Sequence, residues 1–363
     1  MTHLNELYLI LNKYLKWNKS HLKCFALIML VIILKQTCNL SSASKALPIK
    51  CLPQSFYRRM QRFFAGQYFD YRQISQLIFN MFSFDQVQLT LDRTNWKWGK
   101  RNINILMLAI VYRGIAIPIL WTLLNKRGNS DTKERIALIQ RFIAIFGKDR
   151  IVNVFADREF IGEQWFTWLI EQDINFCIRV KKNFIVTNHL GKNHKISDLF
   201  RHLKVGQIEC RKRRILVGRV KLYISALQLE NGELLLVVSP QFNANAIQDY
   251  AIRWEIETLF SCLKGRGFNL ENTRLTDPRR VKKLIAVLAI SFCWCYLTGE
   301  WQHDQKKAIK IKKHGRLSMS LFRYGLDYVQ MAIQRLIGFG KKEEFKEILA
   351  ILRRQNPDRI RVL

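Results

Sequence analysis

Several patterns that would assign this chain to a familiar class are missing from it. It contains no Cys-x2-Cys pair, and its eight cysteines and seven histidines do not combine at zinc-ligand spacing. The cysteines also lack the regular spacing of a secreted disulfide framework, so reduced, buried thiols in a cytosolic protein fit best. We therefore expect neither a structural zinc nor a disulfide scaffold.

A hydrophobic run long enough to cross a bilayer is also missing. The wholly apolar run at 24–34 has about half the required length and is flanked by Lys23 and Lys35. It lies too far from the start of the chain for an ordinary signal-peptide core. The apolar stretches 103–124 and 284–297 are interpreted as core strands and a buried helix. These patterns predict a soluble protein with no membrane partner.

Acidic residues are scarce. Asp and Glu number 28 against 60 Lys and Arg, which gives a formal charge of +32 spread from Lys13 to Arg361. Such self-repulsion is simplest to explain by a polyanionic partner, although a merely basic soluble protein is the alternative. With 363 residues, of which 49% are apolar, the chain can bury a large core in two or more domains.

Residues 1–82 have helical periodicity without strand alternation, and we expect a helical DNA-binding region there. A short helix after Pro53 mixes basic and aromatic residues over 55–64. Its arginines are candidates for contact with DNA: Arg58, Arg59 and Arg62. The alternative is an ordinary amphipathic helix whose arginines are solvated.

From residue 87 the pattern changes to that of an α/β, mixed-sheet (α+β) domain. Three strands, with a tight turn at Arg113-Gly114, precede a helix whose Asp131 and Glu134 form a capping-box pattern. A strand, a helix and another strand follow. The predicted strands are 87–92, 103–112, 115–124, 151–157 and 175–181, and the predicted helices are 131–146 and 162–171.

The remaining segments complete the predicted organisation. Residues 185–245 look like a β-rich insertion with a turn near Asn231-Gly232, and its basic run supplies two further candidates for DNA contact, Arg211 and Arg213. The predicted domains are a helical region (1–82), a catalytic core (83–184 plus 246–300), the insertion (185–245) and a helical C-terminal region (301–363). A polar stretch at 304–316 resembles a linker.

Four polar residues near the last third of the chain have helical spacing. Tyr250, Arg253, Glu257 and Lys264 are three, four and seven residues apart, which predicts one face of a single α-helix. The opposite, apolar face would enter a core through Ile252, Ile256, Leu259 and Leu263. A carboxylate between cations and a phenol suits metal-assisted chemistry on a phosphate backbone. A solvated ion pair of Glu257 is the alternative.

Two further carboxylates, Asp92 and Asp157, each stand at the end of a predicted strand. Together with Glu257 they could form a site of hard oxygen ligands for Mg²⁺, or Mn²⁺, with two ions able to act on a phosphodiester. Taken singly, an Asp at a strand end more often caps a turn.

The combination resembles the insertion-sequence DDE transposases of the group with the Tyr-x2-Arg-x3-Glu-x6-Lys signature. The residues from Tyr250 to Lys264 match every interval of this signature. The segments 92–96 (DRTNW) and 156–160 (ADREF) look like the group's two aspartate motifs. The resemblance spans roughly residues 50–300, with three motifs in the family's order.

This resemblance implies a ribonuclease-H-like core interrupted by a β-insertion, and cut-and-paste transposition through a hairpin at the transposon end. It implies that Asp92, Asp157 and Glu257 are catalytic metal ligands for two Mg²⁺ ions, and that Tyr250, Arg253 and Lys264 hold end DNA. The partners would be double-stranded DNA, both inverted repeats and target, and a second copy of the chain, with the C-terminal helices as the dimer surface. The location would be the bacterial cytoplasm, at the nucleoid.

One part of the family pattern is missing. Formation of a hairpin needs an aromatic platform for an unstacked base, yet residues 185–249 contain no Trp. Phe184, Phe200 and Phe242 are the candidates. The alternative function is a basic DNA-binding protein without catalysis, which explains the charge but leaves the three carboxylates unexplained.

Overall fold

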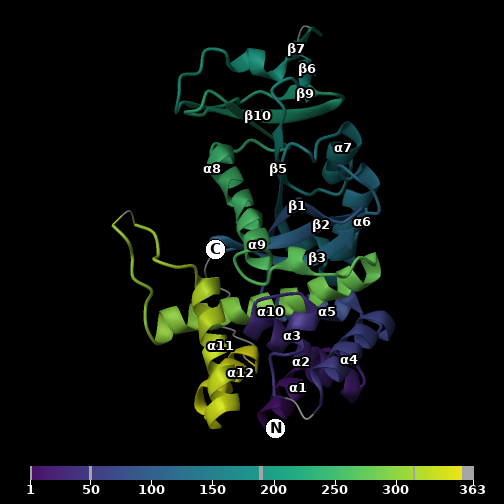
Figure 1. Cartoon of the computed structure of the whole chain (residues 1–363). Coiled ribbons are helices and arrows are strands. Elements are labelled where there is room, and N and C mark those ends of the chain that lie inside the picture. The colour runs from purple at the N-terminus through teal and green to yellow at the C-terminus, as the bar shows by residue number, and fades with distance from the viewer. Residues whose placement is uncertain (1, 49–50, 188–190, 314, 354–363) are drawn as a thin grey trace. The chain divides into compact units, whose positions relative to one another are not determined.

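The computed structural model describes residues 2–48, 51–187, 191–313 and 315–353 (Figure 1). The chain divides into two compact units. The helical unit comprises residues 1–84, 96–103 and 260–363, and the sheet unit comprises residues 85–95 and 104–259. Both units are built from segments that are distant in the sequence.

The helical unit contains the N-terminal and C-terminal helices, as their apolar periodicity predicts. Its central helices are α2 and α10, which are buried along most of their length. Burial of an all-apolar run on every side is the expected fate of the segment 24–34 in a large core. The helices are α1 (Thr2–Tyr14), α2 (Lys19–Lys35), α3 (Leu40–Ala43), α4 (Pro53–Gly66), α5 (Tyr71–Met81), α10 (Pro278–Gln305), α11 (Leu321–Phe339) and α12 (Glu343–Arg353), with a short 3₁₀ turn at Leu270–Asn272.

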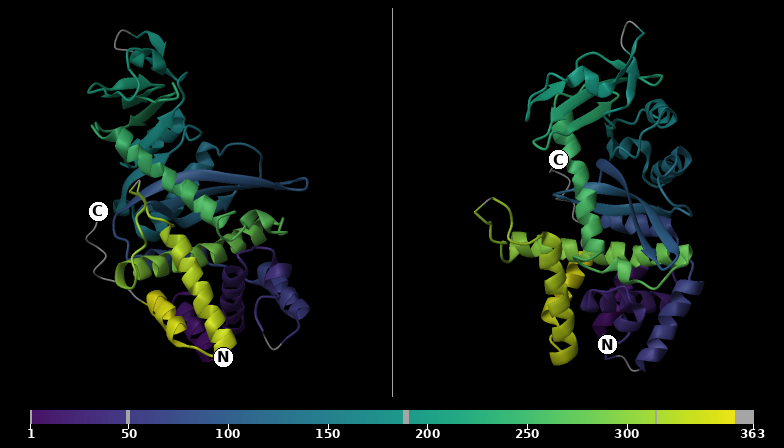
Figure 2. Two further views of the ribbon diagram at one scale, coloured as in Figure 1. Left: turned by 60° about the vertical axis from the view of Figure 1, so that its left-hand side comes forward. Right: turned by 45° about the horizontal axis from the view of Figure 1, so that its top comes forward.

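Helix α11 packs against α10 (Figure 2). Two glycines, one on each helix, lie where the helices are in contact. A Cβ atom on Gly299 would lie 1.9 Å from the carbonyl oxygen of Leu321, and one on Gly325 would lie 1.8 Å from that of Cys295. No side chain can be accommodated at these distances, so the two backbones approach each other only because both residues are glycine. This close crossing fixes the C-terminal helices to the core of the unit.

One described helix, α10, is long and apolar enough to cross a membrane by length and composition. Within its most apolar window, 89% of the residues are buried inside the protein. The helices at Asn5–Tyr14 and Lys19–Lys35 meet the same criterion only when taken together, and they are bent by 113°. Buried core helices of globular proteins have the same composition, so these features are weak indicators of a membrane span.

The sheet unit is a mixed sheet of eleven described strands, which confirms the predicted fold class. Strands β1, β4 and β5 are parallel, and β2 and β3 form an antiparallel hairpin. The order β3-β2-β1-β4-β5 is that of a ribonuclease-H-like core. The core strands are β1 (Val87–Trp98), β2 (Arg101–Tyr112), β3 (Ile115–Leu123), β4 (Ile151–Ala156) and β5 (Phe176–Val180), and the helices beside them are α6 (Thr132–Phe146) and α7 (Glu163–Glu171), with a 3₁₀ turn at Lys148–Arg150.

Local signals in the sequence explain several of these boundaries. Arg113 and Gly114 both have positive φ angles, as a two-residue hairpin between twisted strands requires. Asp131 and Glu134 form the predicted capping box at the start of α6. Both predictions are confirmed.

The insertion continues the core sheet. Strands β10 and β11 form the hairpin predicted around Asn231-Gly232, and β11 pairs antiparallel with β5. The sheet therefore runs from the core directly into the insertion. Its strands are β6 (Ile185–Thr187), β7 (Asn193–Lys195), β8 (Ile208–Cys210), β9 (Ile215–Val217), β10 (Val220–Gln228) and β11 (Leu234–Ser239), with a 3₁₀ turn at Ile196–Phe200.

The helix that follows the insertion differs from the prediction. Instead of one α-helix, α8 (Ala246–Ala251) is joined to α9 (Glu255–Leu263) by a 3₁₀ turn at Ile252–Trp254, and Figure 1 shows the three as one continuous rod. Lys264 lies beyond the end of α9. The prediction of a single α-helix through all four signature residues is therefore wrong, because a 3₁₀ turn winds more tightly and rotates the later residues relative to the earlier ones.

The cysteines depart in part from the expectation of buried thiols. All eight lie in the described residues, and none is in a disulfide. Six are buried, whereas Cys51 is exposed and Cys210 is half-buried. The prediction is thus wrong for Cys51.

Candidate active site

The first two acids lie side by side on neighbouring parallel strands. In the register of β1 and β4, Leu91 is paired with Ala156, so Asp92 and Asp157 are the next residue on each strand. The prediction that Asp157 follows the end of its strand is confirmed. The same prediction is wrong for Asp92, because β1 continues to Trp98 in the hairpin with β2. Asp92 instead marks the point where the parallel pairing with β4 ends.

Arg253 joins the first acid to the third. Its Nη1 lies 3.2 Å from Oδ2 of Asp92, and its Nη2 lies 2.6 Å from Oε1 of Glu257. The guanidinium is buried, with a side chain only 4% exposed, whereas the side chain of Glu257 is 55% exposed. The buried Nε of Arg253 has no hydrogen-bond partner in the part of the chain that the structure describes. One cation is therefore shared by two carboxylates from distant parts of the sequence.

Tyr250 connects the same helix to the second acid. It is buried in an apolar cluster that includes Phe155, Cys177 and Val237, and its hydroxyl donates to Oδ1 of Asp157 at 3.4 Å. Burial raises the pKa of this phenol well above its usual value, which keeps it a neutral donor. Tyr250 therefore acts on Asp157 through the protein interior in this arrangement.

The environment of Asp92 favours its protonated form. Burial raises the pKa of Asp92 from 3.8 to about 7, and the nearby charges of Glu159 and Asp157 act in the same direction. The backbone N–H of Arg93, which donates to Asp92 at 2.7 Å, and the charge of Arg253 oppose this shift. A carboxyl group with a pKa this close to neutrality will gain strongly from any additional cation.

These contacts bear on whether the acids can hold a divalent ion. Among the described residues, no three His, Cys, Asp or Glu side chains are arranged to hold a metal directly. The donor set nevertheless fits Mg²⁺ or Mn²⁺, because it consists of carboxylate oxygens and already surrounds a cationic group, the guanidinium of Arg253. A metal bound by Asp92 and Glu257 together requires Arg253 to release them.

The fourth signature residue, Lys264, belongs to the helical unit. Its ammonium pairs with Glu271 at 2.7 Å and lies 6.0 Å from the ring centre of Trp96. Trp96 is buried, so it packs as a core residue. Both of these contacts lie within the helical unit.

The other basic candidates are exposed on their own units, except Arg211, which is partly buried. On α4, the aromatic residues point inward and the arginines outward, with Arg59 donating to the carbonyl of Ser20. In the insertion, Arg213 is exposed, whereas Arg211 is held by Glu209 and by the carbonyl of Leu199. A hollow of about 660 Å³ in the insertion is lined by four cations and no acid: Arg211, Arg213, Arg214 and Lys221.

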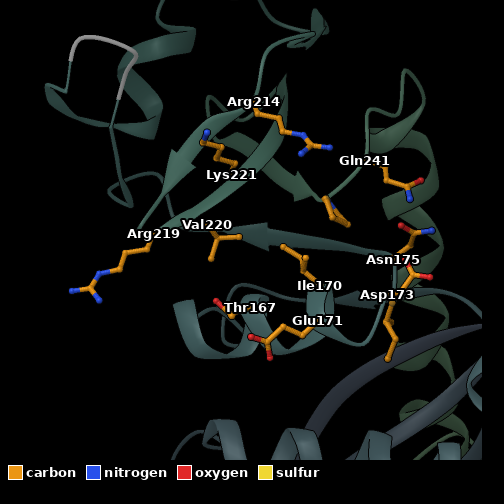
Figure 3. A pocket seen from close by; sticks show the side chains of 12 residues that line it. Thr167, Ile170, Glu171, Asp173, Asn175, Arg214, Arg219, Val220, Lys221 and Gln241 are labelled. Carbon is orange, nitrogen blue, oxygen red and sulfur yellow. The ribbon is translucent and has the colours of Figure 1, made fainter.

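Another hollow, of about 440 Å³, lies away from the three acids (Figure 3). Figure 3 shows Arg214 and Lys221 on the strands of the insertion, and Glu171 and Asp173 on the other side of the hollow, at and just after the end of α7. Because charges of both signs line it, a polyanion would meet repulsion as well as attraction there. We therefore do not assign it to the active site.

Two functional candidates close to the signature residues were not predicted from the sequence. Trp254 lies next to Arg253, and 47% of it is exposed, which is unusual for so large an apolar side chain. Glu255 accepts hydrogen bonds from the backbone N–H groups of Tyr112 and Gly114, and so ties α9 to the β2–β3 turn. Exposure cannot be read from helical periodicity across a 3₁₀ turn, and the Glu255 contact joins positions far apart in the sequence.

Of the three phenylalanines that are candidates for stacking an unpaired base, only Phe242 is largely exposed. Phe200 is buried beneath Arg211, and Phe184 is half-buried. Trp254 thus joins Phe242 as an accessible ring in the sheet unit.

Comparison with known proteins identifies the family to which the chain belongs. No curated protein matches the chain. One similar solved structure is described as the cryo-EM structure of the piggyBac transposase synaptic complex with hairpin DNA. The similarity covers 98% of this chain and 84% of that chain, at 12% sequence identity and a TM-score of 0.45. A similarity this low supports no conclusion. Residues 83–294 match the family described as Transposase DDE domain, which spans more than half of the chain and includes all three acids. The chain belongs to the DDE transposase family.

Proposed function

We propose that the protein is a cut-and-paste DNA transposase of the group with the Tyr-x2-Arg-x3-Glu-x6-Lys signature, cutting at the inverted repeats of its element and forming a hairpin at the cut end. Its membership of the DDE transposase family supports DNA transposition as the general activity. The observation that carries the finer proposal is the grouping of Asp92, Asp157 and Glu257 around Arg253 and Tyr250. Three motifs from distant segments meet in one unit.

Asp92, Asp157 and Glu257 would hold the divalent ions, Mg²⁺ or Mn²⁺. When bound, such ions activate an attacking hydroxyl group and stabilise the departing oxygen of a phosphodiester. Because both lie on the sheet, Asp92 and Asp157 form the rigid side of the site. Glu257, which is more exposed and sits on α9, forms the side that DNA reaches from solvent.

Arg253 would change partners when DNA binds. In this structure it forms ion pairs with both Asp92 and Glu257. A phosphate of the end DNA is tetrahedral, but its two non-bridging oxygens can accept a pair of hydrogen bonds from a guanidinium, as the two oxygens of a carboxylate do. Transfer of Arg253 to a phosphate would free both carboxylates at the moment when substrate is present.

The remaining roles follow exposure and charge. Trp254 is the accessible ring nearest in sequence to Arg253 and Glu257, and we assign to it the stacking of an unpaired base. The exposed arginines of α4 and the insertion, together with Lys264, would bind DNA phosphates. Cutting the two ends of an element requires two active sites, so the protein would act as a dimer on DNA, with the C-terminal region as the interface. It would be a nucleoid-associated protein of the bacterial cytoplasm.

The test is cleavage of DNA that carries the ends of the element, with Mg²⁺ present. Replacement of Asp157 by Asn keeps the size and the acceptor for Tyr250 but removes the charge, so cleavage should be lost while DNA binding remains. Retained cleavage would remove Asp157 from the catalytic centre. The alternative, a basic DNA-binding protein without catalysis, is favoured by the ion pairs that occupy Asp92 and Glu257, and it predicts binding that is indifferent to Mg²⁺ and no cleavage of any end.

A further inference from the structure

A second set of contacts joins the two aspartate segments without using either aspartate. Arg93 follows Asp92, and Glu159 lies two residues after Asp157. The two side chains form a forked pair, with Nε of Arg93 3.2 Å from Oε1 of Glu159 and Nη2 3.2 Å from Oε2. Both side chains are largely buried, 14% and 20% exposed. The fork fixes distance and orientation together, which a single ion pair does not.

The guanidinium of Arg93 is also fixed on its other edge. Its Nη1 donates to Oδ1 of Asn104 at 3.0 Å. Asn104 is buried in β2 and donates in turn to the carbonyl oxygens of Lys126 and Gly128, both at 3.0 Å. Arg93 is therefore held by the neighbouring strand and by the loop that follows β3, so it cannot follow Glu159 if that residue moves.

The main chain at Glu159 is held independently. Arg135 of α6 is buried, and its guanidinium donates to the carbonyl oxygen of Glu159 at 2.9 Å and to that of Ile161 at 3.2 Å. The same guanidinium lies over the ring of Phe160. The turn that begins at Asp157 is thus attached to α6 through its carbonyl groups and to β1 through the Glu159 carboxylate.

We propose that Arg93 and Glu159 are positioning residues that set the separation of Asp92 and Asp157. The proposal rests on the proposed function, since it takes these two aspartates as metal ligands. Glu159 is close enough to Asp92 for its charge to affect that carboxyl group. Both carboxylate oxygens of Glu159, however, accept hydrogen bonds from Arg93. It therefore serves to hold the Asp157 turn against β1, and it is not itself a ligand.

The expected effect is on metal affinity rather than on the chemical step. Contacts that orient metal ligands usually change affinity by about 10- to 100-fold when removed. Loss of the fork would leave both aspartates present but less firmly positioned relative to each other, so more metal would be required to occupy the site. Once metal is saturating, the rate of cleavage should return to within a few-fold of the parent.

The experiment compares Glu159→Gln and Arg93→Lys with the parent chain. Glu159→Gln keeps the shape and removes the charge, and Arg93→Lys keeps the charge and removes the fork. Arg158→Gln is the matched control. Arg158 lies between Asp157 and Glu159 in the sequence, but it is exposed and pairs with Glu233. Binding of Mn²⁺ to the full-length, DNA-free chain is measured by calorimetry, and the Mg²⁺ concentration for half-maximal cleavage is measured on end DNA.

We expect Mn²⁺ binding by Glu159→Gln and Arg93→Lys to weaken about 10- to 100-fold, with the same shift in the Mg²⁺ requirement and no change in the control. The double variant should be little worse than either single variant, because the two changes remove one shared interaction. Affinity equal to the parent in a folded variant overturns the inference and leaves the proposed function standing. If Glu159→Gln does not fold, Arg93→Lys decides alone. Absence of both Mn²⁺ binding and cleavage in the parent contradicts the proposed function itself.

Discussion

The shared cation at Arg253 makes a prediction that does not depend on knowing the DNA substrate. Replacing Arg253 by Gln removes the charge that neutralises Asp92 and Glu257. Removal of one partner from a buried ion pair typically costs about 3–5 kcal/mol. We take the lower part of this range, because Glu257 is half-exposed and its share of the interaction is screened by solvent.

A divalent cation should restore much of this loss. In the parent chain a metal must displace Arg253 from Asp92, whereas in Arg253→Gln it meets no competitor. An ion pair at about 4 Å with an effective dielectric constant near 20 contributes at most about 4 kcal/mol. Since 1.4 kcal/mol is about tenfold in affinity, the variant should bind Mn²⁺ between about ten and a thousand times more tightly.

The assay is denaturation of the full-length chain in chelator and in Mg²⁺, at alkaline pH so that Asp92 is ionised. In chelator Arg253→Gln should be clearly less stable than the parent. At a Mg²⁺ concentration of about 100 times the dissociation constant of the variant, binding stabilises the variant by about 2.7 kcal/mol. The parent, which binds more weakly, gains less, so the difference in stability should narrow by at least about 1 kcal/mol. The control is Arg323→Gln, which removes a half-exposed Arg–Asp pair at the same helical spacing and should cost less than about 1 kcal/mol in either buffer.

One result would refute this reasoning. If Arg253→Gln were destabilised equally in chelator and in Mg²⁺, and bound Mn²⁺ no more tightly than the parent, then Arg253 would not occupy a cation site. It would instead be a structural ion pair that the metal never replaces.

Three further predictions follow from the site. Burial raises the pKa of Asp92 from 3.8 to about 7, so between these pH values the folded state retains a proton that the unfolded state releases. The free energy of unfolding of the metal-free chain should therefore fall as the pH rises from about 4 to about 7, by at most about 4 kcal/mol. Glu255, whose pKa burial raises to about 7, acts in the same direction, and denaturation of Asp92→Asn across this range should show a shallower slope. Trp254→Ala should remove the stacking of an unpaired base, which contributes about 1–3 kcal/mol, and so weaken hairpin formation. The loss should be seen as reduced fluorescence quenching of a base analogue at the DNA end, while the melting temperature of the protein stays near that of the parent. Replacing Arg58 and Arg62 together by Gln should reduce the dependence of DNA affinity on salt, by about 0.9 in logarithmic slope for each phosphate that is no longer neutralised; an unchanged slope would place α4 away from DNA.

The sequence predicted the fold through signals that are local. Alternation of apolar residues identified the strand at 87–92, and apolar runs identified the strands at 103–112 and 115–124. The capping pair Asp131 and Glu134 identified the start of α6. The hairpin at Arg113-Gly114 was readable from its glycine, which adopts a positive φ angle without steric cost, whereas the positive φ of Arg113 has no signal of its own in the sequence. Each of these features depends only on neighbours along the chain.

The parts that could not be predicted depend on pairing between distant segments. The strand of Asp92 looked short because 93–98 is mostly polar, yet it continues as a ladder with β2. The 3₁₀ turn before Glu255 has neither Gly nor Pro to announce it. The fork between Arg93 and Glu159 depends on the register of β1 against β4, which no local pattern specifies.

The pairing of β11 with β5 has a consequence for any attempt to trim the protein. The last strand of the insertion pairs with β5 along Ile178 to Val180, opposite the side on which β5 pairs with β4. Excising 185–245 would therefore turn β5 into an edge strand with unpaired backbone N–H and C=O groups. An exposed edge strand of this kind can pair with strands of other chains and so promote aggregation. A shortened chain of this kind should precipitate, so the insertion is better altered by point changes on its surface than cut away as a module.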